Sequence, residues 1–219
     1  MPSFEPLPQS YFERPTLKVA RDLLGAYLVH ETPEGTLAGR IVETEAYLSD
    51  DPAMHGWRAA CNDEGFVLPI GRAADLFAEP GRSYVYLTYF TNWLVNVVTE
   101  PEGTAGAVLI RAIEAVEGIE QMRFARPAAR RDRDLGSGPA KLAQALGITG
   151  KDWHGIDMTK PPLFFAAGDP VPDSEIVRTS RIGVNRGADL PYRFLIKGHP
   201  CVSPGVPSNI RLARKAERG

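Results

Sequence analysis

The stretch Gly39–Tyr47, with the sequence GRIVETEAY, constrains the fold most strongly because it combines two acids with residues that favour burial. Its isoleucine, valine, threonine and tyrosine are typical of a half-buried β-strand. Side chains alternate between the faces of a strand, so Glu43, Glu45 and Tyr47 share one face. An unpaired buried charge is costly, so these carboxylates need a partner, a chemical role or a solvated strand edge. The stretch alone favours the solvated edge and leaves the other two open.

Turn-forming sequences divide the rest of the chain into short segments that favour strands. Thr32–Gly35 and Glu100–Gly103 each place proline and glycine between apolar runs, as β-turns do. Apolar residues at helical spacing predict helices over residues 16–24, 114–126 and 140–146. We expect strands over residues 26–31, 36–47, 83–88, 93–99, 105–113, 163–167, 175–177, 181–184 and 192–197.

Three regions differ from this pattern. Residues 1–15 are expected to be an irregular N-terminal segment, and residues 204–219 a frayed, basic C-terminal tail. Residues 48–82, which include His55, lack periodicity and are rich in glycine and proline. A long loop of this kind is typical of a functional segment. Because we find no internal repeat and no linker, we expect residues 16–203 to form one domain.

Several protein classes are excluded by what the sequence lacks. No apolar run approaches the roughly 20 residues of a membrane-spanning helix, and the N-terminus has no continuous apolar segment typical of a signal peptide. Cys61 and Cys201 are the only cysteines, which fits a reducing intracellular compartment. No HExxH, CxxC or phosphate-binding loop is present, so we expect neither a metal nor a cofactor.

Positive charge is clustered, although the formal net charge is only −2. One cluster of arginines lies within residues 123–133, and a second occupies the tail, with Arg211, Arg214, Lys215 and Arg218. Arginine pairs with phosphate in a bidentate geometry, so either cluster could contact nucleic acid. Either could equally be a solvated face.

Arg111 is a separate case because it interrupts the apolar run of residues 107–113. An arginine in a buried strand needs a carboxylate or phosphate partner. Glu43 and Glu45 are the obvious candidates. The simplest alternative is a plain buried ion pair, which stabilises a fold only weakly.

Together these segments resemble the alkyladenine (3-methyladenine) DNA glycosylases, the monofunctional alkylpurine enzymes of base-excision repair. GRIVETEAY combined with a later SGPAKLAQAL is much more specific than either motif alone. The resemblance covers residues 16 to about 203 and implies a single α+β (mixed α/β) domain, with a curved antiparallel sheet flanked by helices and a protruding β-hairpin. The matching segments are ARDLLGAYLV (20–29), GRIVETEAYL (39–48), DPAMH (51–55), PGRSYVYLTY (80–89), VLIRAIE (108–114), SGPAKLAQALGI (137–148), RIGV (181–184) and YRF (192–194).

The resemblance implies a catalytic set of three residues. Glu45 matches the general base that activates a water molecule. Arg111 and the main-chain carbonyl of Ile182 match groups that hold this water. Hydrolysis of an N-glycosidic bond needs such a carboxylate to deprotonate the nucleophile and to stabilise positive charge on the sugar.

The resemblance also implies a pocket for a base that has left the duplex. Tyr47, His55 and Tyr86 match the groups that sandwich and hydrogen-bond this base. Asn96 matches the residue that screens bases by their exocyclic groups. Aromatic faces favour electron-poor alkylated purines, much as they attract cations.

Further residues are implied in DNA contact. Tyr89 matches the hairpin-tip residue that enters the duplex, and Phe90, where the family has glycine, makes this wedge bulkier or double. Arg72 and Lys141 are implied contacts to the DNA backbone. The chain also departs from the family pattern within residues 72–77 and in additional residues around 61–70.

The implied function is excision of alkylated or deaminated purines from double-stranded DNA, leaving an abasic site. The implied substrates are 3-methyladenine and 7-methylguanine, with hypoxanthine and 1,N6-ethenoadenine as further candidates. No lysine lies near these motifs to form a Schiff base, which indicates a monofunctional enzyme. We expect a monomer without membrane contact, located with the nucleoid in the cytoplasm of a bacterium or in the nucleus of a eukaryote.

Two alternatives belong to other functional classes. One is a nucleic-acid-binding module that keeps the scaffold without catalysis, and the other is a hydrolase of free nucleosides. Intact Glu45, Arg111 and Tyr47 argue against the first alternative. The wedge hairpin and the helix that carries Lys141 argue against the second.

Overall fold

The structure is a computed structural model that describes residues 4–217. Its strands are β1 (Tyr27–Thr32), β2 (Gly35–Leu48), β3 (Ser83–Thr88), β4 (Asn92–Val98), β5 (Gly106–Glu117), β6 (Leu163–Ala166), β7 (Ile176–Thr179) and β8 (Arg193–Ile196). Its α-helices are α1 (Gln9–Phe12), α2 (Thr16–Asp22), α3 (Ile119–Ala125), α4 (Pro139–Ala145), α5 (Gly150–Trp153) and α6 (Ser208–Ala216). Three 3₁₀ helices are η1 (Gly71–Phe77), η2 (Asp132–Asp134) and η3 (Asp173–Glu175).

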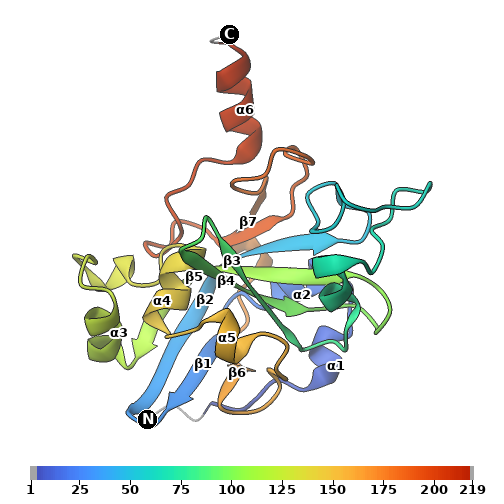
Figure 1. The fold of residues 1–219 in the computed structure, drawn as a ribbon. Helices are drawn as coiled ribbons and strands as arrows, with labels where there is room; N and C mark the ends of the chain where they lie inside the picture. The colour runs from blue at the N-terminus through green and yellow to red at the C-terminus, as the bar shows by residue number, and fades with distance from the viewer. Residues whose placement is uncertain (1–3, 218–219) are drawn as a thin grey trace.

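The strands form one eight-stranded antiparallel sheet in which β2 is central (Figure 1). The path of the sheet is β3-β4-β5-β2-β1-β6, and β7 and β8 lie off this path. Strand β2 pairs with β5 from Ala38 to Leu48 on one side. On its other side it pairs first with β1 and then, through Glu43–Glu45, with β8. The acids of β2 therefore lie inside the sheet, and the solvated-edge interpretation is wrong.

Two bulges interrupt the pairing of β2 with β5 next to the acids. The register advances from Ile41–Ile113 to Glu43–Ala112, which leaves Val42 as an extra residue on β2. It then shifts between Glu43 and Thr44, which leaves Arg111 without a directly opposed partner on β2. Bulges bend a strand and re-aim side chains, and they are common near active sites. Here they place the Arg111 side chain beside the carboxylates.

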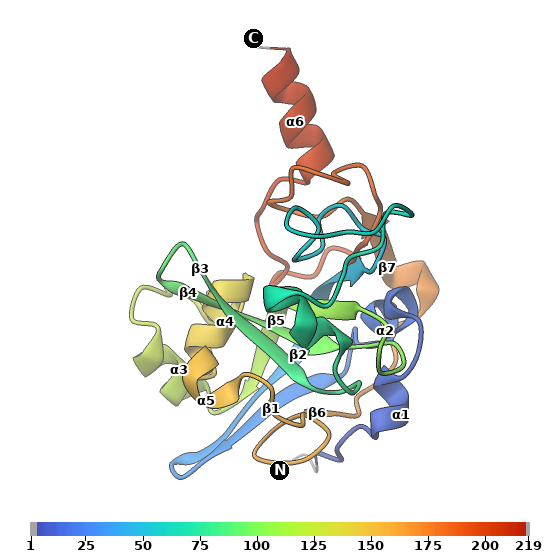
Figure 2. The same ribbon diagram turned by 45° about the vertical axis from the view of Figure 1, so that its right-hand side comes forward.

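Helices flank the sheet, which confirms the α+β fold with a curved antiparallel sheet (Figure 2). Helix α2 packs on β2 and β5, and the Thr44 hydroxyl donates to the carbonyl of Ala20 in this helix. Helix α4 packs on β4 and β5, and α3 contacts α4. Apolar residues from the sheet, α2 and α4 form one continuous core, which fixes the strands that carry the site residues.

The predicted boundary of one helix is wrong. Residues 114–117 continue β5 instead of opening a helix over 114–126, because Ala115 and Glu117 pair with residues of β2. Sheet pairing here overrides local helical propensity. Gly118 turns the chain with a φ of 71°, and α3 starts at Ile119.

The predicted strand over residues 181–184 is also absent from the structure, because its backbone N–H groups bond to side chains. The N–H of Ile182 donates to Glu45, and that of Val184 donates to the Ser208 hydroxyl. This segment forms a loop that follows β7, which we call the 180–187 loop.

Both termini are more ordered than expected. The N-terminal segment contains α1, and Phe12 within it is completely buried in the core. The tail forms α6, which projects from the body of the molecule in both ribbon views (Figures 1 and 2). Arg218 lies outside the described residues. Residues 48–82 are largely irregular, as expected, apart from η1.

Candidate active site

A cavity of about 570 Å³ opens between the β3–β4 hairpin, the loop around His55 and the 180–187 loop. Its volume falls in the range typical of small-molecule sites. Seven of the residues singled out from the sequence line this cavity: Tyr47, His55, Tyr86, Tyr89, Asn96, Arg111 and Ile182. Glu45, Phe90, Arg72 and Lys141 are not among its lining residues.

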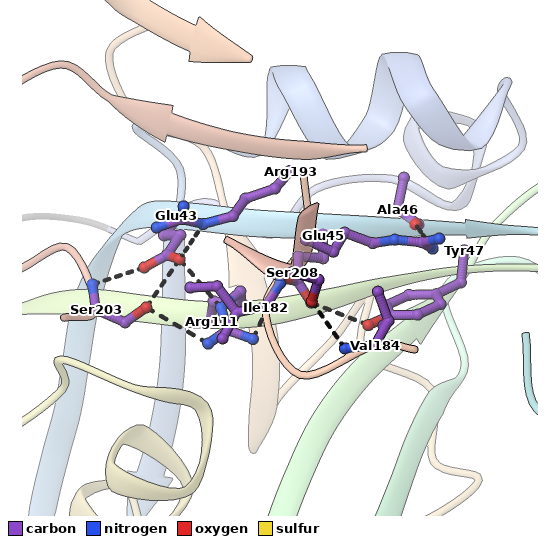
Figure 3. Close-up of polar contacts among 11 residues, drawn as sticks. Glu43, Glu45, Ala46, Tyr47, Arg111, Ile182, Val184, Arg193, Ser203 and Ser208 are labelled. Atoms are coloured by element: carbon purple, nitrogen blue, oxygen red, sulfur yellow. Dashed lines mark hydrogen bonds and ion pairs between the residues drawn. The ribbon is translucent and has the colours of Figure 1, made fainter. Parts of the chain in front are cut away.

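Glu45 lies directly behind the cavity wall, with its side chain completely buried. Its Oε2 accepts a hydrogen bond of 2.9 Å from the Tyr47 hydroxyl. Its Oε1 accepts one of 2.7 Å from the N–H of Ile182 and lies 3.2 Å from Nη1 of Arg111 (Figure 3). All three of these neighbours line the cavity. Glu45 therefore bonds directly to three residues of the cavity wall.

Arg111 joins the two acids of β2, as the sequence predicts. Its Nε donates to Oε1 of Glu43 over 3.0 Å, while its Nη1 faces Glu45. Burial disfavours the charge of this guanidinium, but the carboxylates of Glu45 and Glu43 outweigh it and raise the pKa of Arg111. The cation is permanent, and it reaches the cavity from the bulge on β5.

Glu43 has a different environment from Glu45, since both of its oxygens accept hydrogen bonds from residues that tie strands together. Arg193 donates to it over 2.6 Å, in addition to Arg111. The backbone N–H and the hydroxyl of Ser203 donate over 2.7 and 2.9 Å (Figure 3). This network joins β2, β5, β8 and the segment around residue 203. Glu43 therefore stabilises the part of the sheet that carries Glu45.

Arg181, which we did not single out from the sequence, packs over the Tyr47 ring. Arg181 is completely buried, and its guanidinium binds the Asp51 carboxylate and the carbonyl of Ala46. The same guanidinium lies 4.6 Å from the centre of the Tyr47 ring, within cation–π range. Burial and the neighbouring Glu45 charge hold the pKa of Tyr47 well above its ordinary value, so its hydroxyl remains a donor to Glu45.

Further aromatic groups line the cavity. The His55 ring lies 4.4 Å from that of Tyr86, and its Nδ1 is 2.6 Å from the Tyr84 hydroxyl. Burial, followed by the charge of Arg72, lowers the pKa of His55, which is therefore neutral at pH 7. Burial raises the pKa of Tyr86 to about 12. The described ring contacts of Tyr86 are with His55 and Tyr84 and not with Tyr47.

Asn96 forms a polar point in this otherwise aromatic wall. It lies on β4, is 3% exposed and pairs in register with Leu109 of β5. Its Nδ2 donates to the carbonyl of Tyr84 over 2.9 Å, which fixes the amide against the hairpin. Since Asn96 also lines the cavity, this amide is in position to contact a bound ring.

The β3–β4 hairpin ends in two exposed aromatic residues. Tyr89 is 84% exposed and Phe90 is 95% exposed. Both have positive φ, at 49° and 60°, a region that non-glycine residues adopt at a cost of about 1–2 kcal/mol each. An exposed aromatic pair held by a strained turn is not explained by core packing.

The two residues expected at the DNA backbone lie outside the cavity. Arg72 is exposed on η1, close enough to His55 for its charge to affect the pKa of that residue. Lys141 is half-buried in α4, and its Nζ donates to the Ser137 hydroxyl over 3.1 Å.

Two negative observations apply to residues 4–217. They contain no group of three or more histidine, cysteine or acidic side chains arranged to hold a metal ion. None of their helices has the length and apolar character that a membrane crossing requires.

Comparison with known proteins decides the family. The model of the methylpurine-DNA glycosylase family matches residues 10–200. The chain belongs to this family.

Three curated relatives agree with this assignment, and each is named "Putative 3-methyladenine DNA glycosylase". A relative from Salinibacter ruber is 56% identical over 206 residues, which cover 93% of this chain and 99% of the relative. One from Carboxydothermus hydrogenoformans is 45% identical, covering 90% and 98%. One from Rubrobacter xylanophilus is 48% identical, covering 89% and 96%.

As a member of the methylpurine-DNA glycosylase family, the protein is a monofunctional DNA glycosylase of the alkylpurine type that acts in DNA repair. The absence of lysine among the described residues that line the cavity agrees with this class, since a bifunctional glycosylase needs an amine nucleophile.

Proposed function

We propose that this enzyme removes 3-methyladenine and 7-methylguanine from double-stranded DNA, and that hypoxanthine and 1,N6-ethenoadenine are further substrates. The observation that carries the proposal is the ion pair between the buried Glu45 and Arg111, which lines an aromatic cavity next to an exposed aromatic hairpin tip. A base inside a duplex must be flipped out before its glycosidic bond can be cleaved, and stacking in a pocket offsets this cost.

In the proposed reaction, Glu45 takes a proton from a water molecule that then attacks the anomeric carbon of the sugar. Arg111 and the carbonyl of Ile182 hold this water. The bond from the sugar to the purine nitrogen breaks, and its electron pair leaves with the base. The ionised carboxylate also stabilises the positive charge that develops on the sugar.

In the same proposal, the flipped base lies between Tyr47 on one side and Tyr86 with His55 on the other. Arg181 holds the Tyr47 ring in place through its contact at 4.6 Å. A neutral His55 can donate or accept a hydrogen bond at the base edge, and the Asn96 amide tests the exocyclic group of the purine. Tyr89 and Phe90 occupy the gap that the base leaves in the duplex. Arg72 and Lys141 contact the DNA backbone.

The decisive experiment compares wild-type protein with Glu45→Gln on duplexes that each hold one of the four lesions. We expect release of free base from wild type and a rate lower by about 100- to 10,000-fold in the variant, because general-base catalysis contributes an effect of this size. Binding to the lesion duplex should persist. Release at the wild-type rate by Glu45→Gln would show that Glu45 is not the base.

Glu120→Gln is a matched control, because Glu120 is 83% exposed on α3 and does not line the cavity. It should release base at the wild-type rate. The same assay separates the alternatives: a binding-only module would release no base from any duplex, whereas a nucleoside hydrolase would act on free methylated nucleosides as well as on DNA.

The remaining features of the proposal concern the state of the protein. We propose that it acts as a monomer, with residues 16–203 as the glycosylase domain, residues 1–15 as an N-terminal segment and residues 204–219 as a basic C-terminal extension. Its DNA substrate places it with the nucleoid in the cytoplasm of a bacterial cell, or in the nucleus of a eukaryotic one.

A further inference from the structure

A second cavity, of about 690 Å³, lies next to the first and is strongly positive. Arg211, Arg214 and Lys215 of α6 line it, and none of its lining residues is acidic. This concentration of charge contrasts with the formal net charge of −2 for the whole chain. A cationic concavity on a slightly acidic protein is a site for an anionic partner.

The two cavities share part of their lining. Both are lined by Tyr89 at the hairpin tip and by Ile182, Gly183 and Asn185 of the 180–187 loop. The first cavity adds Arg186 from the same loop. A strand whose nucleotide entered the first cavity would therefore extend over the second.

Helix α6 is fixed to this loop at its first turn. The Ser208 N–H donates to the carbonyl of Arg181 over 2.7 Å, and the Ser208 hydroxyl accepts from the N–H of Val184 over 3.1 Å. Arg211 donates to Asn185 and to the carbonyl of Val184, over 2.8 and 3.0 Å. The first turn of the helix is thus held at a set position beside the cavity, while the rest of the helix is largely exposed.

The cations of α6 share one helical face. Arg211, Arg214 and Lys215 are spaced by three and four residues, which places them side by side. All three are exposed, and within residues 4–217 neither Arg214 nor Lys215 has an ion-pair partner. Unpaired exposed cations beside a cavity remain available for an external anion.

This helix lies outside the part of the chain that matches the family model. The match ends at residue 200, whereas α6 spans Ser208–Ala216. A contribution of α6 is therefore not part of what the family match shows.

We propose that α6 is a DNA-binding element that grips the phosphates of the strand flanking the flipped nucleotide, through Arg214, Lys215 and the free part of Arg211. This inference rests on the proposed function, since it takes the occupant of the first cavity to be a nucleotide of DNA. Phosphate contacts contribute affinity without reading sequence or lesion, and each releases counterions, so their number sets the salt dependence of binding.

The test uses the double variant Arg214→Gln/Lys215→Gln, which removes two charges and keeps good helix formers. Binding is measured by fluorescence anisotropy over a series of salt concentrations, with an undamaged duplex and the same duplex containing hypoxanthine. We expect affinity for both duplexes to fall by the same factor, about 10-fold at low salt. The slope of log K against log salt concentration should decrease in magnitude by about 2.

The matched control is Lys151→Gln/Lys197→Gln, which makes the same change of net charge at two exposed lysines that line neither cavity. It should retain most of the wild-type affinity and slope. The proposal would be overturned if the two double variants had equal effects, or if Arg214→Gln/Lys215→Gln kept the wild-type slope. In either case this face would be solvated or would bind an acidic protein.

The outcome is separable from that of the proposed function. The salt slopes are measured as binding and do not depend on base release. If wild-type protein released no base, the proposed function would fail, whereas the comparison of salt slopes would still decide the role of α6.

Discussion

At the scale of single residues, the two acids of β2 have the same side-chain chemistry and differ in the residues that surround them. Both are completely buried and both contact Arg111. Glu45 bonds to residues of the cavity wall, whereas Glu43 bonds to Arg193 and Ser203, which tie strands together. The first acid is therefore in position for chemistry, and the second supports the frame.

This difference predicts a stability defect for Glu43→Gln. The substitution leaves the buried Arg193 guanidinium without a carboxylate, and breaking one partner of a buried ion pair costs about 3–5 kcal/mol. We expect a loss of about 3 kcal/mol in the free energy of unfolding, measured by urea denaturation. Glu120→Gln, at an exposed position, should change it by less than about 0.5 kcal/mol. Equal stability of the two variants would show that the Glu43 network contributes little.

The sequence predicts part of this residue network and misses another part for a physical reason. An arginine in an apolar strand requires a carboxylate, so the partnership of Arg111 with Glu43 and Glu45 follows from burial cost. Arg181 and Asp51 lie 130 residues apart in irregular segments. Such segments have no periodic pattern from which to predict which side chains are buried or which of them face each other. Their pairing depends on how the loops fold over Tyr47, and that is a tertiary property.

At the scale of elements, the same limit applies to helices and strands. Strands bounded by clear turns are predicted nearly correctly, because alternation and turn residues are local signals. Residues 114–117 are assigned to a helix from local pattern, yet their pairing with β2 makes them strand. Residues 208–216 are expected to be a frayed tail, although Leu212, Ala213 and Arg214 are good helix formers; they form α6, which bonds from Ser208 fix to the 180–187 loop.

The hairpin tip gives an element-scale prediction that separates stability from function. Replacing Phe90 by glycine removes the ring that we propose as a wedge and also relieves a positive φ of 60°. We expect the free energy of unfolding of Phe90→Gly to equal that of wild type or to exceed it by up to about 1 kcal/mol. Base release from duplex DNA should fall by about 10-fold, because no phenylalanine ring then replaces the base stacking that is lost when the nucleotide flips out. Release from single-stranded DNA should not change.

Phe90→Tyr is the control for this prediction, because it keeps an aromatic ring on the same strained backbone. It should release base from duplex at nearly the wild-type rate. Undiminished duplex activity in Phe90→Gly would assign the wedge to Tyr89 alone.

At the scale of the whole molecule, the N-terminal segment completes the core around the sheet that carries the site. Leu7 donates its N–H to Phe165 in β6 over 2.8 Å, and the N–H of Ala167 donates to Glu5 over 2.9 Å, so the segment covers the edge of the sheet. Phe12 then enters the core, with its ring centre 5.5 Å from that of Phe165. The segment expected to be irregular is in fact a structural part of the domain.

Phe12→Ala should therefore destabilise the entire fold and not only the terminus. Deleting a buried phenylalanine ring costs about 3–5 kcal/mol through lost burial and the cavity left behind. We expect this loss in the free energy of unfolding, with a single cooperative transition seen equally by far-UV circular dichroism and tryptophan fluorescence. Phe124→Ala provides the matched control, because Phe124 is 90% exposed, and it should change stability by less than about 0.5 kcal/mol. A separate early transition in Phe12→Ala, with the main transition at its wild-type position, would mean that the N-terminal segment unfolds independently of the sheet.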